Sequence, residues 1–272
     1  MQEEATTLGA GDVLTPRTLD EALRWKSEFP DAVPIQGGTD LMVELNFDRA
    51  RPQALLNLNE VEELRGWSRN NGKMWLGAGL TYAEAMRPPL SELLPALAEA
   101  ARTVGGPQIR NRGTIGGNLA TASPAGDALP PLLVSGAEVK LGSVDGERWI
   151  PLQEFLIGPK HNDLREDELI LGVDVKTGTP ESRQTFMKVG PRNAMVIAVV
   201  SLALRVDQEL RAAFGSAGPV PTLVRARLNE VDSFPDRVAE AASPIDDVRG
   251  TAAYRGHALR VLTKRALERC LA

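Results

Sequence analysis

The sequence predicts an α+β fold in which a larger N-terminal part is followed by a smaller C-terminal domain. Of the 272 residues, 43% are hydrophobic and 25% are charged, as in a soluble globular protein with a sizeable core. Short apolar runs of strand character alternate with segments of helical spacing. The turn-forming segment TGTPESR, residues 177–183, is the best candidate for a boundary. We therefore expect one domain over residues 1–178 and another over residues 179–272.

Charge and residue content exclude several classes of function. The net charge is −5 and the basic residues are scattered, which argues against nucleic-acid or anionic-membrane binding. Cys270 is the one cysteine, and His161 and His257 lie far apart, so we expect no disulfide, iron–sulfur cluster or other metal site in this chain. The N-terminal stretch MQEEATTLGAGD lacks signal-peptide features, and no apolar run approaches the roughly 20 residues that span a bilayer. We expect a cytoplasmic protein without membrane insertion.

The N-terminal elements are predicted from caps and apolar runs. In VLTPRTLDEALRW a helix follows Thr18, with Glu21 as its capping-box partner. The run LMVELNF, residues 41–47, is compatible with either a helix or a strand. A later helix is capped by Thr81 and stopped by the prolines at positions 88 and 89. Strands are predicted at residues 32–35, 54–58 and 74–78.

Helix signals and alternating residues continue to the expected boundary. Residues 93–104 have helical spacing and end at a Gly–Gly pair, a helix C-terminus signal. Residues 107–127 are expected to form a loop, and residues 130–134 a helical turn. Alternating apolar and polar residues, with a turn at residues 142–147, indicate antiparallel strands at residues 137–141, 149–152 and 169–175.

The C-terminal domain begins with β-branched, strand-like runs. Strands are predicted at residues 186–189, 194–206 and 210–216. From Val224 onward the spacing of Leu and Val is helical. This pattern predicts a three-stranded antiparallel sheet packed by helices.

Two glycine-rich segments are the candidate ligand site. They are PIQGGTDLM, residues 34–42, and PQIRNRGTIGGNLATASPAGD, residues 107–127. Glycine lets backbone N–H groups approach a ligand closely, and the interleaved hydroxyl and amide side chains add donors. Tight turns without a ligand are the alternative reading. Neither GxGxxG nor GxxxxGK[ST] occurs, so the common nucleotide motifs are absent. Two such segments indicate an extended ligand that has a phosphate and a flat heterocycle.

The string RNRGTIGGNLATASPAGDALPPLL, together with PIQGGTDLM, resembles the FAD-binding subunit of molybdenum hydroxylases. This family includes xanthine dehydrogenases and the medium subunit of aerobic carbon monoxide dehydrogenase. The resemblance covers essentially the whole chain. Further similar segments are LTPRTLDEAL, LREDELILGVDV, FMKVGPRNAMVIAVVSLAL, GSAGPVPTLVRA and YRGHALRVLTKRAL.

The resemblance implies a fold and a set of cofactor-binding residues. The fold is a FAD-binding domain of the vanillyl-alcohol-oxidase (PCMH) type, with subdomains of about residues 1–60 and 61–178, followed by a small sheet-and-helix domain. The first glycine turn would hold the pyrophosphate of FAD through its backbone amides: Pro34, Ile35, Gln36, Gly37, Gly38, Thr39, Asp40 and Leu41. The second would reach the diphosphate and the ring system: Thr114, Ile115, Gly116, Gly117 and Asn118.

Further positions match family contacts, and several keep an alternative role. Asp127 would accept hydrogen bonds from FAD on its adenosine side, or it caps the following helical segment. Lys188 would face the N1–C2 carbonyl edge of the flavin, or it is a solvated strand residue. Val104 would lie near the isoalloxazine, and Leu164 would be a further contact. Thr121 and Ser123 would brace the loop or touch the flavin, and Arg110 and Arg112 would be surface charge or face a partner or the FAD phosphates.

The implied function is electron transfer within a multi-subunit oxidoreductase. The partners would be a molybdopterin-binding large subunit and a small subunit with [2Fe–2S] clusters, both separate chains because this one lacks the cysteines and the length. Electrons would pass through FAD to NAD⁺ or another acceptor. The alternatives are a stand-alone FAD oxidase or reductase on the same fold, and an assembly subunit without catalytic function.

Overall fold

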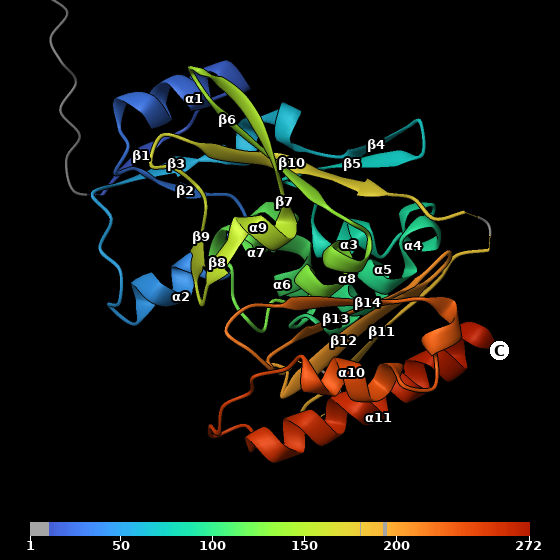
Figure 1. Ribbon diagram of the computed structural model, residues 1–272. Helices are drawn as coiled ribbons and strands as arrows, with labels where there is room; N and C mark the ends of the chain where they lie inside the picture. The colour runs from blue at the N-terminus through green and yellow to red at the C-terminus, as the bar shows by residue number, and fades with distance from the viewer. Residues whose placement is uncertain (1–10, 180, 193–194) are drawn as a thin grey trace, which may run out of the picture.

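The computed structural model describes residues 11–179, 181–192 and 195–272, which form alternating layers of sheet and helix (Figure 1). The stretch MQEEATTLGAGD, expected to lack a signal peptide, falls almost entirely outside these residues. The layers are, in order, a five-stranded sheet, a group of short helices, a four-stranded sheet and two C-terminal helices, with a small N-terminal sheet beside the first layer. The expectation of mixed helix and sheet is confirmed.

The N-terminal sheet is parallel and positions the first glycine turn. Its strand order is β1 (Asp12–Leu14), β3 (Ala54–Asn57) and β2 (Val33–Ile35). Helix α1 (Leu19–Glu28) is capped by Thr18, whose Oγ1 accepts a hydrogen bond from the amide of Glu21 at 3.2 Å. The Glu21 carboxylate binds the amide of Arg17, not that of Thr18, so the expected capping box is only half formed. Residues 41–47 are helical, as α2 (Leu41–Asn46), and two 3₁₀ turns follow β3, η1 (Leu58–Glu60) and η2 (Glu62–Leu64).

The five-stranded sheet is antiparallel throughout. Its order is β4 (Trp67–Asn70), β5 (Lys73–Gly77), β10 (Leu169–Lys176), β6 (Glu138–Ser143) and β7 (Gly146–Pro151). The strands predicted within β5, β6, β7 and β10 are confirmed. Strand β4 was not predicted, because its four residues are all exposed and show no apolar alternation.

A group of short helices lies between the two large sheets (Figure 1). The expected loop at residues 107–127 is mostly helical, which corrects the prediction. Pro107 occupies the first turn of α6, Thr114 caps α7 through the amide of Gly117 at 3.0 Å, and Ala122 ends α7 in a left-handed conformation. The helices are α3 (Tyr82–Ala85), α4 (Leu90–Leu93), α5 (Pro95–Thr103), α6 (Pro107–Arg112), α7 (Ile115–Thr121), α8 (Leu129–Val134) and α9 (Leu152–Phe155), with a hairpin of β8 (Leu156–Gly158) and β9 (His161–Asn162).

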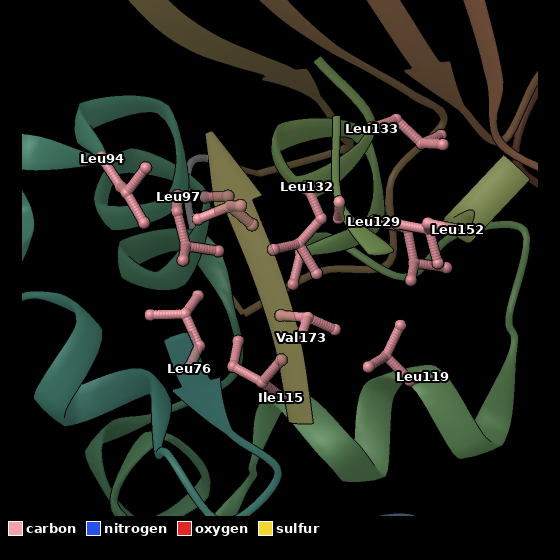
Figure 2. Close-up of a cluster of buried hydrophobic side chains, with 14 of the residues drawn as sticks. Leu76, Leu94, Leu97, Ile115, Leu119, Leu129, Leu132, Leu133, Leu152 and Val173 are labelled. Atoms are coloured by element: carbon pink, nitrogen blue, oxygen red, sulfur yellow. The ribbon is translucent and has the colours of Figure 1, made fainter. Parts of the chain in front are cut away.

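The largest hydrophobic core fixes these helices on the sheet. Leu76 of β5, Ile115 of α7 and Val173 of β10 point toward one another, with Leu132 of α8 above them (Figure 2). Each of these side chains is at most 1% exposed. Burying a side chain of this size contributes about 1.5–3 kcal/mol. Ile115, the first residue of α7, therefore anchors the second glycine segment in the core.

The C-terminal sheet has four antiparallel strands, one more than predicted. They are β11 (Arg183–Val189), β12 (Val200–Val206), β13 (Leu210–Gly215) and β14 (Thr222–Ala226). The helix predicted from Val224 is wrong at its start, because buried Val224 and Ala226 flank exposed Arg225 in strand alternation. The strand predicted from residue 194 begins at Val200, and Ala194 itself lies outside the described residues.

Two helices cover the outer face of this sheet, and α5 and α8 cover its inner face. The outer helices are α10 (Phe234–Glu240) and α11 (Ala252–Leu271), with a 3₁₀ turn η3 (Leu228–Glu230) before them. The Glu99 carboxylate of α5 accepts hydrogen bonds from the amide of Phe186 at 2.7 Å and from Arg269 at 2.8 Å, which ties α5 to the C-terminal domain. None of the helices described, α11 included, has the length and apolar character needed to cross a membrane.

Arg148 of β7 holds the segment before β10 through a partly buried ion-pair cluster. Its guanidinium donates to Glu168 at 2.6 Å and to Asp163 at 2.8 Å, and the Glu168 side chain is 5% exposed. Burial alone would raise the pKa of Glu168, but hydrogen bonds from Arg148 and from the amide of Arg165 lower it. The Glu168 carboxylate therefore stabilises the fold above its unfolded pKa, and this contribution is lost as the pH falls through the lowered folded pKa.

We expect Arg148→Met to lower the free energy of unfolding at pH 7 by about 1.5–3 kcal/mol, the usual range for hydrogen bonds to charged groups. The deficit should shrink below about pH 4, where Glu168 in the unfolded chain is protonated. Denaturant unfolding at pH 7 and pH 3.5 measures both values. Arg69→Met, at an exposed position on β4, is the control and should change the stability by less than about 0.5 kcal/mol. An equal deficit for Arg148→Met at both pH values would contradict the assignment.

Candidate functional site

A groove runs between the first glycine turn and the N-terminal part of α7. It encloses a cavity of about 240 Å³. Three stretches far apart in the sequence form its walls: β2 with the turn that follows it (residues 33–41), residues 113–121 around α7, and the segment from Leu164 to the start of β10. The structure thus brings together the two glycine segments that the sequence singled out.

Four consecutive backbone amides in the first turn are unused within the described part of the chain. The N–H groups of Gly37, Gly38, Thr39 and Asp40 donate no hydrogen bond to any described residue. Gly37, Gly38 and Thr39 are half-buried at the groove wall. Half-buried amides without an internal acceptor require water or a ligand. Successive N–H groups in such a turn suit an anion with several acceptor oxygens.

The glycines in the groove are required by close backbone contacts. A Cβ on Gly37 would overlap the carbonyl oxygen of Arg112, because the two glycine segments touch there. A Cβ on Gly116 would lie 2.7 Å from the Cβ of Ala78 on the floor of the groove. Gly38 has a φ of +72°, a conformation that other residues rarely adopt. These contacts explain the glycines by local geometry.

Side-chain hydrogen bonds fasten the two glycine segments to each other. Thr121 Oγ1 donates to Gly117 O at 2.9 Å and contacts Asp40 Oδ2 at 3.3 Å. Arg112 donates to the carbonyl of Gln36 at 2.9 Å. The Oδ1 atom of Asn118 is buried and has no partner in the described structure. A buried acceptor without a partner in the protein requires water or a ligand.

The two arginines left open by the sequence both bind backbone carbonyls. Arg110 donates to Val104 O at 3.0 Å and to Gly105 O at 2.6 Å. Arg112 bridges Gln36 O and Asn59 Oδ1. Arg112 thus braces the groove wall at Gln36, whereas Arg110 braces the turn between α5 and α6.

Most of the expected site residues line the groove. They are Pro34, Ile35, Gln36, Gly37, Gly38, Thr39, Asp40, Leu41, Thr114, Gly116, Gly117, Asn118, Thr121 and Leu164. Ile115 does not line it, because its side chain is fully buried in the core and its amide is taken by Leu80 O. Ser123 lies away from it and accepts a hydrogen bond from the amide of Ala125, so it braces its own loop.

Asp127 and Lys188 form a buried ion pair outside the groove. Lys188 Nζ donates to Asp127 Oδ2 at 2.6 Å and lies 3.5 Å from Thr103 O. Their side chains are 10% and 5% exposed, so the reading of Lys188 as a solvated residue is wrong. The alternative of Asp127 as a helix cap is also wrong, since α8 has Ala128 at its N-cap and no side-chain cap. The two residues thus lie together, whereas the expectations placed Asp127 on the adenosine side of FAD and Lys188 at the flavin.

Burial shapes the electrostatics between this pair and the groove. It raises the pKa of Asp127, and the Lys188 ammonium opposes the change. It also raises the pKa of Tyr82, which the carboxylates of Asp127 and Asp40 raise further. Tyr82 thus lies near both the ion pair and the groove, which it lines. The Asp127 Oδ1 atom is buried without a partner in the part of the chain described.

Several groove residues were missed by sequence reasoning. Ala78, Tyr82 and Ile170 line the floor between the two glycine segments. Ala78 and Tyr82 were placed in a strand and a helix, and no motif marked them as ligand contacts. Backbone hydrogen bonds to the second glycine segment bring Ala78 and Tyr82 to the site. The amide of Gly116 donates to Ala78 O at 2.8 Å, and the amide of Tyr82 donates to Gly113 O at 3.1 Å. Such pairings leave no local signal in the sequence.

Comparisons with known proteins identify the family and the fold of the chain. Residues 7–175 match a family described as the FAD binding domain in molybdopterin dehydrogenase. The chain is 28% identical to the xanthine dehydrogenase FAD-binding subunit of Escherichia coli O157:H7, over 94% of each chain. It is 32% identical to the 6-hydroxypseudooxynicotine dehydrogenase complex subunit alpha of Paenarthrobacter nicotinovorans, over 96% of this chain and 94% of that one. A chain of reconstituted CO dehydrogenase from Oligotropha carboxidovorans has the same fold, with a TM-score of 0.90 at 22% identity over 97% and 99% of the two chains.

Proposed function

The chain belongs to the family of FAD-binding domains in molybdopterin dehydrogenases, and from this premise we propose that it is the electron-transfer subunit of a multi-subunit molybdenum hydroxylase. Its cofactor is FAD, and the relatives found are subunits of oxidoreductases. The observation that carries the proposal is the groove with four unused backbone amides between two touching glycine segments.

The groove residues fit the phosphate-bearing part of FAD. The amides of Gly37, Gly38, Thr39 and Asp40 would hold the pyrophosphate, which would otherwise be buried without donors at a prohibitive cost. Thr114, Gly116, Gly117 and Asn118 would reach the diphosphate and the ring system, with Gly116 and Gly117 keeping the backbone close. The glycines that leave no room for a Cβ and the orphaned Asn118 Oδ1 support this assignment.

The buried ion pair would act as a unit at the ring end of the cofactor. Lys188 Nζ lies 2.6 Å from Asp127 Oδ2 and also lies near Thr103 O. Val104, the next residue after Thr103, packs at the edge of the main core. Placing Asp127 beside Lys188 at the flavin replaces its expected role on the adenosine side. When bound, FAD supplies the redox chemistry, and a neighbouring charge pair tunes its electronics.

The proposed domain organisation follows the sheets. A FAD-binding domain of the vanillyl-alcohol-oxidase (PCMH) type would span residues 1–178, with subdomains of about residues 1–60 and 61–178. The C-terminal domain would span residues 179–272. The support is that the five-stranded sheet ends at Lys176 and the four-stranded sheet begins at Arg183, while the parallel sheet ends at Asn57.

The partners would be a molybdopterin-binding large subunit and a small subunit with [2Fe–2S] clusters. Electrons would pass from those clusters through FAD to NAD⁺ or another acceptor. The support is that this chain covers 94% of a relative named as the FAD-binding subunit of a xanthine dehydrogenase, a name that assigns the other functions to other chains.

Copurification tests the proposed assembly. We expect the tagged full-length chain, isolated from its own organism, to bring down two further proteins together with molybdenum and iron. The chain alone, loaded with FAD, should not oxidise xanthine. A chain that purifies without partners and still oxidises a substrate at the FAD would contradict the assembly and favour a stand-alone oxidase.

A further inference from the structure

The segment of residues 123–126 connects α7 to Asp127 and is held from the C-terminal domain. Within the segment, the amide of Gly126 donates to Ser123 O at 2.9 Å. From the other domain, the amide of Ser216 donates to Pro124 O at 2.8 Å. This hydrogen bond joins the end of β13 to the chain between Thr121 and Asp127, both of which are expected FAD contacts.

Ser216 is itself fixed by a buried arginine of α11. Its φ of +63° is unusual for a serine, and its carbonyl accepts a hydrogen bond from Arg255 Nη1 at 2.6 Å. Arg255 is 2% exposed, and its Nη2 donates to Asp247 Oδ1 at 2.5 Å. Asp247 also binds Arg249 at 2.6 Å. A continuous set of hydrogen bonds therefore runs from Asp247 through Arg255 and Ser216 to Pro124.

Residues 123–125 of the segment border an open cavity on the side that faces Ser216 and Arg255. The cavity has a volume of about 320 Å³, with Ser123, Pro124, Ala125, Ser216, Arg249 and Arg255 in its wall. The segment is thus not held there by close packing alone. A Cβ on Gly215 would lie 3.0 Å from Pro124 O, which shows how closely the strand end approaches the segment. If the guanidinium were removed, both Ser216 and the segment would have room to move.

We infer that Arg255 is a positioning residue of the cofactor site, which holds residues 123–127 in place through Ser216 and thereby sets the affinity for FAD. This inference rests on the proposed function. Arg255 touches neither the groove nor the Asp127–Lys188 pair, and it acts only through the backbone of Ser216 and Pro124. The C-terminal domain would in this way control the part of the site that carries Asp127.

Two variants and two measurements test the inference on the full-length chain. We expect Arg255→Gln to raise the dissociation constant for FAD about tenfold, measured by quenching of flavin fluorescence at a temperature where circular dichroism shows the fold intact. Arg255→Lys keeps a charged donor on a longer side chain than that of glutamine, so it can still reach Ser216 O and should stay within about threefold of the wild type. Hydrogen exchange of the apo chain should be faster at the amides of Gly126 and Ser216 in Arg255→Gln. If that variant does not fold, Asp247→Ala removes the carboxylate that accepts from Arg255 Nη2 and should show the same two changes.

Arg211→Gln is the matched control. Arg211 is also a buried arginine paired with an aspartate, Asp207, but it lies at the opposite end of β13 from Ser216. The Arg211→Gln variant should be less stable than the wild type. Its hydrogen exchange at residues 123–127 should be unchanged, and its FAD affinity should stay within about twofold of the wild type. An Arg255→Gln variant with unchanged exchange at these amides, or with the FAD affinity of the control, would overturn the inference. Failure of the wild-type chain to bind FAD would instead overturn the proposed function, and the link to affinity with it.

Discussion

Replacing Gly37 with alanine should weaken FAD binding by at least about 100-fold, which is about 2.7 kcal/mol. The added Cβ would overlap the carbonyl oxygen of Arg112, a backbone atom that cannot rotate away. The two glycine segments must then separate, which displaces residues 37–40 from their place in the groove wall. The pyrophosphate would lose its donors while remaining in a half-buried site, where each unmet acceptor is costly.

Titration of the apo chain with FAD, followed by flavin fluorescence, measures this effect. Gly256→Ala is the matched control, because nothing lies within 4 Å of its added Cβ and it is within helix α11. It should leave the FAD affinity unchanged and raise the free energy of unfolding by about 0.5–1 kcal/mol. If Gly37→Ala binds FAD as tightly as this control, the first glycine turn does not hold the cofactor.

Lys188→Met should lower the free energy of unfolding by about 3–5 kcal/mol at pH 7. The substitution leaves the Asp127 carboxylate buried without its cation, and its Oδ1 atom already lacks a partner in the described structure. Burial, now unopposed, should raise the pKa of Asp127 further. Since the folded pKa then lies above the unfolded one, the loss is greatest above the folded pKa and diminishes as the pH falls toward the unfolded value.

Denaturant unfolding of the apo chain at pH 7 and pH 4.5 measures both the loss and its pH dependence. The double variant Lys188→Met with Asp127→Asn should recover part of the stability, because an amide costs less to bury than a carboxylate. Lys264→Met, at an exposed position on α11, should stay within about 0.5 kcal/mol of the wild type. A loss for Lys188→Met no larger than that of Lys264→Met would show that the ion pair does not support the fold.

Elements with local signals were predictable from the sequence. Thr18 and Thr81 cap the helices they were expected to cap, because a hydroxyl and the amide three residues later lie within one turn. The end of strand β14 fits a helix by sequence, because residues 225–228, RARL, are also compatible with helical spacing. Its strand conformation comes from pairing with β13, which the local sequence does not indicate. The short helix α7 was hidden by Gly116 and Gly117, because glycine is unfavourable in helices unless the fold requires it, and α6 has only six residues between two flanking glycines.

The groove was predictable where backbone chemistry determines it, and the ion pair was not. The glycine segments mark residues 34–41 and 114–118 directly, because few other residues allow such close contacts. Asp127 and Lys188 are 61 residues apart on different layers, so nothing in the sequence indicates that they meet. The path from Arg255 through Ser216 to Pro124 is equally non-local and uses backbone atoms that carry no sequence signal.

The central claim is that this chain holds FAD in the groove between its two glycine segments, and a titration of the purified full-length chain with FAD tests it most directly. We predict saturable binding of one FAD per chain. The absorbance of oxidised flavin at about 450 nm should stay with the protein through gel filtration. We also predict a higher melting temperature with FAD, because a ligand that binds only the folded chain stabilises it. A folded chain that shows neither the absorbance nor the stabilisation after reconstitution would contradict the claim.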